Sequence, residues 1–396
     1  MKKKLAALLA ASALAVSALA GCSGSSDDAA EETTQEAAEE EAEEEAAEEE
    51  TQEESEEAEE EAGTAAEEEE IAGNAAQAEE QAEEETGETA AEAETGIEYD
   101  GTEIRVGSLN GPTTMGIVNL MDASDKGEST GNYTFTIGSE ASEVGALITT
   151  GDLDIAMIPA NLAANLYNKT EGGVTVIDIN TLGVLYCVSG DETVTSIEDL
   201  AGRTVMSTGQ GATPEYALRY LLDAYGVEDV EIEFYSEATE VAAYLAEDAS
   251  GIAVLPQPFV TSACAQNEAL EVAFSLTDAW DAVVEDGSML ITGATVVRTA
   301  FLEEHPEAVE VFLAEHASSA EAAADDVEGT AGLVVEYGVL SSEAIAAAAL
   351  PQCNIVCITG EEMADALSGY LKTLYDQDPT AVGGAMPEED FYYTGD

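Results

Sequence analysis

The sequence predicts an α/β protein made of two Rossmann-like lobes joined by two crossover strands. Two observations carry this prediction. A strand–helix–strand pattern occurs twice along the chain, and two apolar segments are each too long to be one buried strand. Alternating strands and helices favour parallel sheets with helices on their faces. The long apolar segments are then expected to pass from one lobe to the other.

The repeated pattern lies in residues 133–159 and 230–256, which align without a gap. The two copies contain the nearly identical hexapeptides SEASEV and SEATEV. Each copy is interpreted as a strand, a helix that begins after a serine cap, and a short buried strand ended by proline. Upstream, NGPTT (110–114) and QGATP (210–214) each stand between a predicted strand and a predicted helix. Each half is therefore expected to be β-turn-α-β-α-β.

The two long apolar segments are residues 173–191 and 288–298. We expect the chain to enter the second lobe near residue 190 and to return near residue 292. Residues 97–188 and 292–396 would then form lobe one, and residues 189–291 lobe two. The region after residue 300 is predicted to be mostly helical, with Pro306 in the first turn of a helix, and to pack back on lobe one.

The first 21 residues have the features of a secretory signal peptide. Three lysines precede an apolar run, Leu5 to Leu19, that is too short to span a membrane. The next residues complete the sequence LAGC (19–22), which matches a bacterial lipobox. This match predicts that Cys22 becomes a lipid-bearing N-terminus, so that the protein is exported and anchored to a membrane rather than embedded in it.

Residues 23–96 differ sharply in composition from the rest of the chain. They contain 33 acidic residues, no basic residue, and Ile71 as the only large apolar residue. Such a segment cannot bury enough apolar surface to fold, so residues 22–96 are predicted to form a disordered, self-repelling tether. Fully extended, it would span about 250 Å. That length suits a thick cell wall and favours a Gram-positive surface; a cation-binding tail is the alternative.

Residues 97–396 hold 52 of the 85 acidic and 7 of the 10 basic residues, a net charge of −45. This charge argues against a nucleic-acid partner. We find no zinc-ligand spacing, phosphate loop or Gly-x-Ser-x-Gly motif, and GQGATP (209–214) lacks the third Rossmann glycine. No catalytic residue, cofactor or metal is therefore predicted. The cysteines at 187, 264, 353 and 357 are expected to be free thiols, and the protein a monomer.

The candidate ligand site lies where the strands of both lobes end. Ligands of open parallel sheets bind beyond the carboxyl ends of the strands, where helix N-termini add positive potential. Trp280, the only tryptophan, could stack on a ring or cover the site. Each candidate could instead serve as a cap or as packing. The candidate ligand-binding residues are Asn110, Thr113, Thr114, Asn161, Gln210, Gly211, Ala212, Thr213, Gln257 and Trp280.

Several segments resemble one family of proteins. NGPTTMGIVNLM, DIAMIPANLAANLYNKT, NTLGVLY, TGQGATPEYALRYLL, LPQPFVT and TGATVVR are similar to segments of the solute-binding lipoproteins of ABC importers, of the nitrate/sulfonate/thiamine-precursor type. The likeness covers about residues 102–393. It implies a Venus-flytrap of periplasmic-binding-protein type II fold that performs no catalysis. It also implies ligand contacts at Thr113, Thr114, Asn161, Gly211, Ala212, Thr213 and Gln257.

The same resemblance implies partners. Such a protein captures a small organic or oxyanionic nutrient and delivers it to a membrane permease driven by an ATPase. A ligand-sensing surface protein and an exported enzyme on the same fold are the alternatives. No Arg or Lys can be assigned to the pocket from the sequence. This slightly favours a neutral or weakly charged aromatic or heterocyclic ligand.

Overall fold

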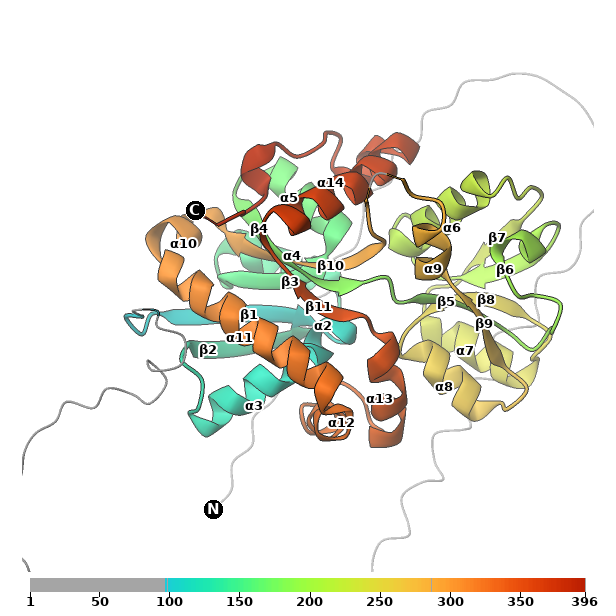
Figure 1. Ribbon diagram of the computed structural model, residues 1–396, viewed down its shortest axis with the longest axis horizontal. Coiled ribbons are helices and arrows are strands. Elements are labelled where there is room, and N and C mark those ends of the chain that lie inside the picture. Colours follow the sequence, from blue (N-terminus) through green and yellow to red (C-terminus); the bar gives the residue numbers. More distant parts are fainter. Residues whose placement is uncertain (1–96, 98, 286, 396) are drawn as a thin grey trace, which may run out of the picture. The chain divides into compact units, whose positions relative to one another are not determined.

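The computed structural model describes residue 97 and residues 99–285 and 287–395. The predicted signal peptide (1–21), the lipidated Cys22 and the tether (22–96) lie outside the described residues. Within them the chain forms a mixed α/β protein with two separate sheets (Figure 1). None of the described helices is both long and apolar enough to cross a membrane.

The first sheet has six strands in the order β11-β4-β10-β3-β1-β2. Strand β1 pairs in parallel with β2 and β3, while β10 runs antiparallel to both β3 and β4. Strands β1 to β4 therefore point the same way and end at one edge. The strands are β1 (Glu103–Leu109), β2 (Asn132–Gly138), β3 (Ile155–Pro159), β4 (Val174–Leu182), β10 (Ile291–Arg298) and β11 (Ile355–Ile358).

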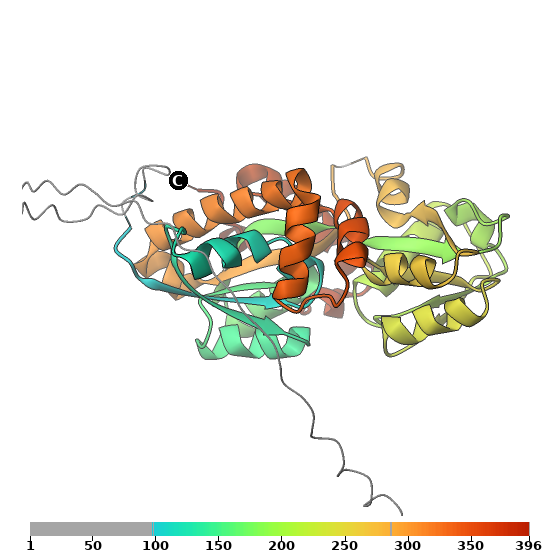
Figure 2. The same ribbon diagram turned by 90° about the horizontal axis from the view of Figure 1, so that it is seen from below.

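Helices cover both faces of this sheet because its central strands are apolar on both sides. In β3, Ile155 and Met157 join the apolar cluster beneath α3, α11, α12 and α13, whereas Ala156 and Ile158 join the one beneath α4, α5 and α14. Figure 2 shows α11 and α12 on one side of the sheet and α4 on the other. The helices are α2 (Pro112–Met115), α3 (Val118–Lys126), α4 (Ala141–Thr150), α5 (Ala160–Thr170), α10 (Thr299–Glu304), α11 (Pro306–Asp325), α12 (Val327–Glu336), α13 (Glu343–Ala349) and α14 (Gly360–Gln377).

The second sheet has five strands in the order β7-β6-β8-β5-β9. Strand β6 pairs in parallel with β7 and β8, and β5 runs antiparallel to β8 and β9. The strands are β5 (Leu185–Ser189), β6 (Thr204–Ser207), β7 (Glu231–Phe234), β8 (Ile252–Pro256) and β9 (Glu271–Ser275). The helices are α6 (Thr213–Ala224), α7 (Ala238–Glu247), α8 (Phe259–Gln266) and α9 (Leu276–Asp281).

The internal repeat is confirmed by the structure. Helices α4 and α7, and strands β3 and β8, occupy the same positions in the two copies. One detail was wrong: the helices are not capped by serine, because Glu140 and Glu237 occupy the N-cap positions and neither forms a side-chain cap. The helix expected after NGPTT is also interrupted, since α2 ends at Met115 and α3 begins only at Val118.

The chain passes between the sheets at two places. Strand β4 ends at Leu182 in the first sheet, and β5 begins at Leu185 in the second. This first crossing is therefore earlier than the expected position near residue 190. The return to β10, which begins at Ile291, lies at the expected position. Four 3-10 helices complete the described elements, at Ile197–Leu200, Leu350–Gln352, Pro379–Val382 and Glu389–Phe391.

Candidate functional site

The strand pairing brings the carboxyl ends of both sheets to the crossover. In the first sheet, the end of β4 pairs with the start of β10 through Leu182 and Ile291. In the second, Leu185 at the start of β5 pairs with Pro256 at the end of β8. Only Gly183 and Val184 separate these two pairs along the chain. The strand ends where ligands bind in open parallel sheets therefore lie on opposite sides of one short connection.

The threonines after β1 bond to their own backbone. Thr113 Oγ1 donates to the carbonyl of Leu109 at 2.8 Å, and Thr114 Oγ1 donates to the same carbonyl at 2.5 Å. Thr114 also lies 2.7 Å from Ser108 Oγ and is fully buried. These hydroxyls fix the turn between β1 and α2. In this arrangement a role for Thr114 as a ligand donor is not supported, and only Thr113 retains slight exposure.

The turn before α6 is closed by a carboxylate from the same helix. The backbone N–H of Gly211 donates to Glu215 Oε2 at 2.7 Å, and Glu215 Oε1 accepts from Arg219 Nε at 2.7 Å. Gly209 and Gly211 have φ angles of 68° and 76°, which favour glycine. The positive potential at the N-terminus of α6 would attract an anionic ligand, but the Glu215 carboxylate already occupies this position.

Two further candidate residues hold the lobes together. Thr213 Oγ1 accepts from the buried Tyr370 hydroxyl of α14 at 3.2 Å. Gln257, at the end of β8, is almost fully buried and donates from Nε2 to Gln352 Oε1 at 3.0 Å. The Thr213 hydroxyl and the Gln257 amide, which we expected to contact the ligand, are therefore hydrogen-bonded within the protein. Their role in this structure is to link the elements around the second sheet to α14 and to the segment after α13.

Trp280 is not exposed to a ligand in this structure. Its side chain is fully buried, and its ring lies 4.4 Å from the ring of Tyr220 and 5.9 Å from that of Tyr370, measured between centroids. From the sequence we expected Trp280 to stack on a ligand ring or to cover the site. In the structure its side chain lies in the protein interior instead. Trp280 packs between α6 and α14 as part of an apolar contact between the lobes.

Three of the candidate side chains are exposed or half-buried and form no hydrogen bond within the described part of the chain. Asn110 follows β1, Asn161 opens α5 directly after β3, and Gln210 lies between β6 and α6. Because β1 and β3 are neighbours, Asn110 and Asn161 come from adjacent strand ends. Gln210 comes from the other sheet. These amides can donate and accept, so they suit a polar ligand without a full charge.

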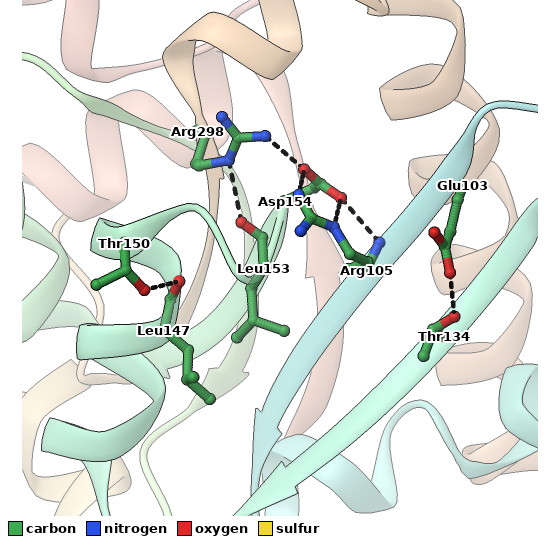
Figure 3. A network of polar contacts seen from close by, with 8 residues as sticks. All are labelled: Glu103, Arg105, Thr134, Leu147, Thr150, Leu153, Asp154 and Arg298. Carbon is green, nitrogen blue, oxygen red and sulfur yellow. Dashed lines mark hydrogen bonds and ion pairs between the residues drawn. The ribbon is translucent and has the colours of Figure 1, made fainter.

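The arginines are paired with carboxylates. Arg105 and Arg298 both bind Asp154, at the opposite edge of the first sheet from the candidate site, with N–O distances of 2.7 and 2.5 Å (Figure 3). Arg203 pairs with Asp191, and Arg219 with Glu215. Every arginine of the chain therefore has an acidic partner. An oxyanion at the site would have no arginine to bind unless one of these pairs broke.

A surface pocket of ≈ 560 Å³ lies away from these strand ends, against α3 and α11. Two acidic side chains line it, Glu128 and Glu315, and Glu315 already accepts hydrogen bonds from the backbone N–H groups of Thr130 and Gly131 and from the Tyr133 hydroxyl. Its lining includes Asn119 and Ser319. None of the sequence-derived site residues lines this pocket, and the Glu315 carboxylate already has its hydrogen-bond partners within the protein.

Sequence reasoning missed two residues at the contact between the lobes, Gln352 and Tyr370. Besides the amide contact, Gln352 accepts at its backbone oxygen from Tyr186 Oη at 2.8 Å. Both residues lie in the C-terminal region that was expected to pack back on lobe one. No local signal marks them, because their role depends on where the returning chain meets the second sheet.

Comparisons with known proteins agree with this geometry. Residues 138–329, a little under half of the chain, match the family model described as NMT1/THI5 like. No curated protein sequence matches the chain. Among solved structures, an ABC transporter protein from Parabacteroides distasonis is 22% identical, with a TM-score of 0.63, covering 74% of this chain and 99% of its own.

Two other solved structures are more distant in sequence. The periplasmic aliphatic sulphonate-binding protein SsuA from Escherichia coli is 12% identical, with a TM-score of 0.58, covering 74% of this chain and 92% of its own. A sulfonate-binding protein described as putative, from Methylobacillus flagellatus, is 16% identical, with a TM-score of 0.51, covering 72% and 88%. The resemblance to ABC-importer solute-binding proteins and the two-lobed fold are thereby confirmed. The three structures are described as an ABC transporter protein and as two sulfonate-binding proteins.

Proposed function

We propose that this protein is the extracellular solute-binding lipoprotein of an ABC importer. It captures a small molecule between the lobe built on the first sheet (β1–β4, β10 and β11) and the lobe built on the second sheet (β5–β9), and delivers it to a membrane permease. The observation that carries the proposal is the meeting of both sets of strand ends at Gly183 and Val184. Lipidation of Cys22 and the acidic tether would hold the protein near its transporter and raise its effective concentration there.

Transport by such a protein requires the ligand to favour one arrangement of the lobes. A ligand can shift that balance only through its extra affinity for the favoured arrangement. Contacts from both lobes supply this difference, and Asn161 and Gln210 are placed one on each lobe. We infer that these two amides, together with Asn110, make the polar contacts that close the lobes on the ligand.

The charge around the site indicates the kind of ligand. All four arginines are paired with carboxylates, and Glu215 occupies the N-terminus of α6. We infer that the ligand is a neutral or weakly charged organic molecule. The sulfonate named for the Escherichia coli relative would here lack a cationic partner. A heterocycle with its own donors and acceptors matches the amides better.

The test is a thermal-shift screen of the mature protein. The panel contains pyrimidines, thiamine precursors, flavins and amino acids, with alkyl sulfonates and inorganic oxyanions as the opposing class. We expect a concentration-dependent rise in Tm for a neutral or weakly charged organic compound, because binding to the folded state stabilises it. A rise confined to sulfonates or nitrate would contradict the ligand class and leave the importer function in place.

Site variants then test the assignment of the residues. Gln210→Ala and Asn161→Ala each remove one side chain that would hydrogen-bond the ligand, so we expect the Kd to rise about 2–10-fold per variant. Gln266→Ala is the matched control, because this exposed glutamine ends α8, at the far end of that helix from β8. Equal affinities in all three variants would reject the site, and an absence of any ligand would reject the function.

A further inference from the structure

Three side chains of types that can bind a metal, two buried and one half-buried, lie close together in the region around the first sheet. This cluster consists of Asp178 from β4, His316 from α11 and Cys357 from β11. One ligand atom from each residue lies within 4.8 Å of the other two. The three residues are far apart in the chain. Only the fold brings them together, so no spacing in the sequence revealed the cluster.

An irregularity in β4 turns Asp178 toward this cluster. Strand β10 pairs Val296 with Val176 but Thr295 with Asp178, which leaves one extra residue in β4 between them. Val176 belongs to the apolar cluster beneath α5 and α14, whereas Asp178 faces α11 on the opposite side of the sheet. Bulges of this kind re-aim side chains and are frequent beside functional sites.

Asp178 has no arginine or lysine partner among the described residues. Its carboxylate is fully buried and accepts from the Thr295 hydroxyl at 2.7 Å, while its other oxygen lies 3.2 Å from His316 Nδ1. Burying a carboxylate without a cation is costly, so this position calls for a positive charge.

The other two residues can meet this need. The imidazole of His316 is fully buried, stacks on Phe312 at 5.5 Å between centroids, and has no hydrogen-bond partner for Nε2 among the described residues. Burial, followed by the charge of Asp178, raises the pKa of the Cys357 thiol. A bound cation would reverse that effect and stabilise the thiolate.

We propose that Asp178, His316 and Cys357 bind one divalent cation of the zinc class. A carboxylate, a neutral imidazole and a thiolate suit this borderline-soft ion, and their two negative charges balance its two positive charges. On binding, the Cys357 thiol releases its proton to solvent, and the sulfur donates to the metal. Ligand atoms of a tetrahedral site lie about 3.5 Å apart, so the cluster needs only a small contraction, and a water molecule would supply the fourth ligand.

Such a site would fasten an otherwise weakly held strand. Strand β11 has four residues, lies at the edge of the first sheet, and pairs irregularly with β4. A metal shared by β4, β11 and α11 would tie this edge strand to the centre of the sheet. We therefore assign the site a structural role, separate from ligand capture at the strand ends.

Cobalt(II) tests the proposal because it reports its ligands by absorption. The mature full-length protein, made without a histidine tag, is stripped with a chelator and titrated with Co²⁺. We expect a thiolate-to-cobalt charge-transfer band that saturates at about one equivalent and disappears when Zn²⁺ is added. The carboxylates of the acidic segment can also bind Co²⁺, but without sulfur they cannot produce this band.

Variants identify the ligands. Cys357→Ser is expected to abolish the band, whereas Cys264→Ser, which changes another half-buried free thiol, should leave it intact. His316→Gln should weaken Co²⁺ binding at least tenfold. If either cluster variant fails to fold, the titration of the wild-type protein still shows whether a thiolate binds the metal. No thiolate band at saturating Co²⁺ would show that the cluster is only a His316–Asp178 pair beside a thiol, and a band that survives in Cys357→Ser would place the metal elsewhere.

Discussion

At Asp154 one buried carboxylate serves two guanidinium groups. Its Oδ1 accepts from Arg105 at 2.7 Å and from Arg298 at 2.5 Å, and its Oδ2 accepts from the Nε and backbone N–H of Arg105 (Figure 3). Burial alone would raise the pKa of Asp154, but these hydrogen bonds outweigh it and hold the pKa below its ordinary value. The group joins β1, the residue before β3 and the end of β10.

Asp154→Asn should therefore destabilise the protein by about 3 kcal/mol near neutral pH, because it leaves two arginines without their shared charge. The folded-state pKa lies below the unfolded value, so this contribution is complete above about pH 4 and is lost as the pH falls through the folded pKa. Urea denaturation of wild type and variant at a series of pH values measures it. The difference in free energy of unfolding should shrink on acidification.

The control is Asp152→Asn, two residues away. Asp152 is exposed, and its side chain only accepts from Thr150 Oγ1. Its replacement should change the free energy of unfolding little at any pH, because exposed polar contacts contribute little. If the difference in free energy of unfolding between wild type and Asp154→Asn grew at acid pH, the Asp154 carboxylate would not stabilise the protein through its charge.

At the residue scale the sequence predicted positions better than roles. Thr113, Thr114 and Thr213 do stand at the start of helices that follow strands, as the Gly-Thr turns indicated. Their hydroxyls nevertheless bond to Leu109 and Tyr370. A turn motif cannot say whether a hydroxyl points to a ligand or to its own backbone. That choice depends on backbone angles and on distant elements such as α14.

At the scale of elements, the connection between β4 and β5 is tightly constrained at Gly183. A Cβ added to Gly183 would lie 2.3 Å from Thr277 Oγ1 and 2.8 Å from Leu290 Cδ2. The carbonyl of Gly183 also accepts from Thr277 Oγ1 and from Asn354 Nδ2. Neighbours from α9, from the segment before β10 and from the segment before β11 thus converge on this residue.

Gly183→Ala should lower the free energy of unfolding by about 1–3 kcal/mol, because the added methyl overpacks the connection. Gly332→Ala is the control: Gly332 lies within α12, and nothing stands within 4 Å of a Cβ there. It should stabilise the protein by about 0.5–1 kcal/mol, since alanine favours helix over glycine. Chemical denaturation measures both, and equal effects of the two variants would count against the packing argument.

Elements were predictable where a pattern repeats. The offset shared by SEASEV and SEATEV predicted the positions of α4, α7, β3 and β8. The break between α2 and α3 and the bulge at Asp178 were not predictable, because both arise from pairing and packing with distant segments. For the same reason the cluster of Asp178, His316 and Cys357 could not be seen in the sequence.

For the whole molecule, negative charge dominates. Residues 97–396 carry a net charge of −45, and six of their seven basic residues already take part in ion pairs. The remaining carboxylates repel one another in the folded state more than in the expanded unfolded state. Salt shortens the range of this repulsion, from about 10 Å at 0.1 M to about 3 Å at 1 M.

The urea midpoint should accordingly rise as salt is added, with little change in the dependence of the unfolding free energy on urea. Sodium chloride and choline chloride should act alike at equal ionic strength, because screening does not depend on the identity of the cation. A midpoint that falls with salt would mean that the ion pairs outweigh the repulsion. A rise with sodium alone would indicate specific cation binding instead.

The two sheets also differ in how the chain supplies their strands. The second sheet uses one continuous stretch, from β5 to β9, whereas the first needs residues before Leu182 and again after Ile291. During synthesis the N-terminal part of the chain is made first. The second sheet can therefore form before β10, β11 and α14 have been made. The first sheet is complete only when β11, which ends at Ile358, has been made. A chain that ends before β10 would therefore contain a complete second sheet and an incomplete first sheet.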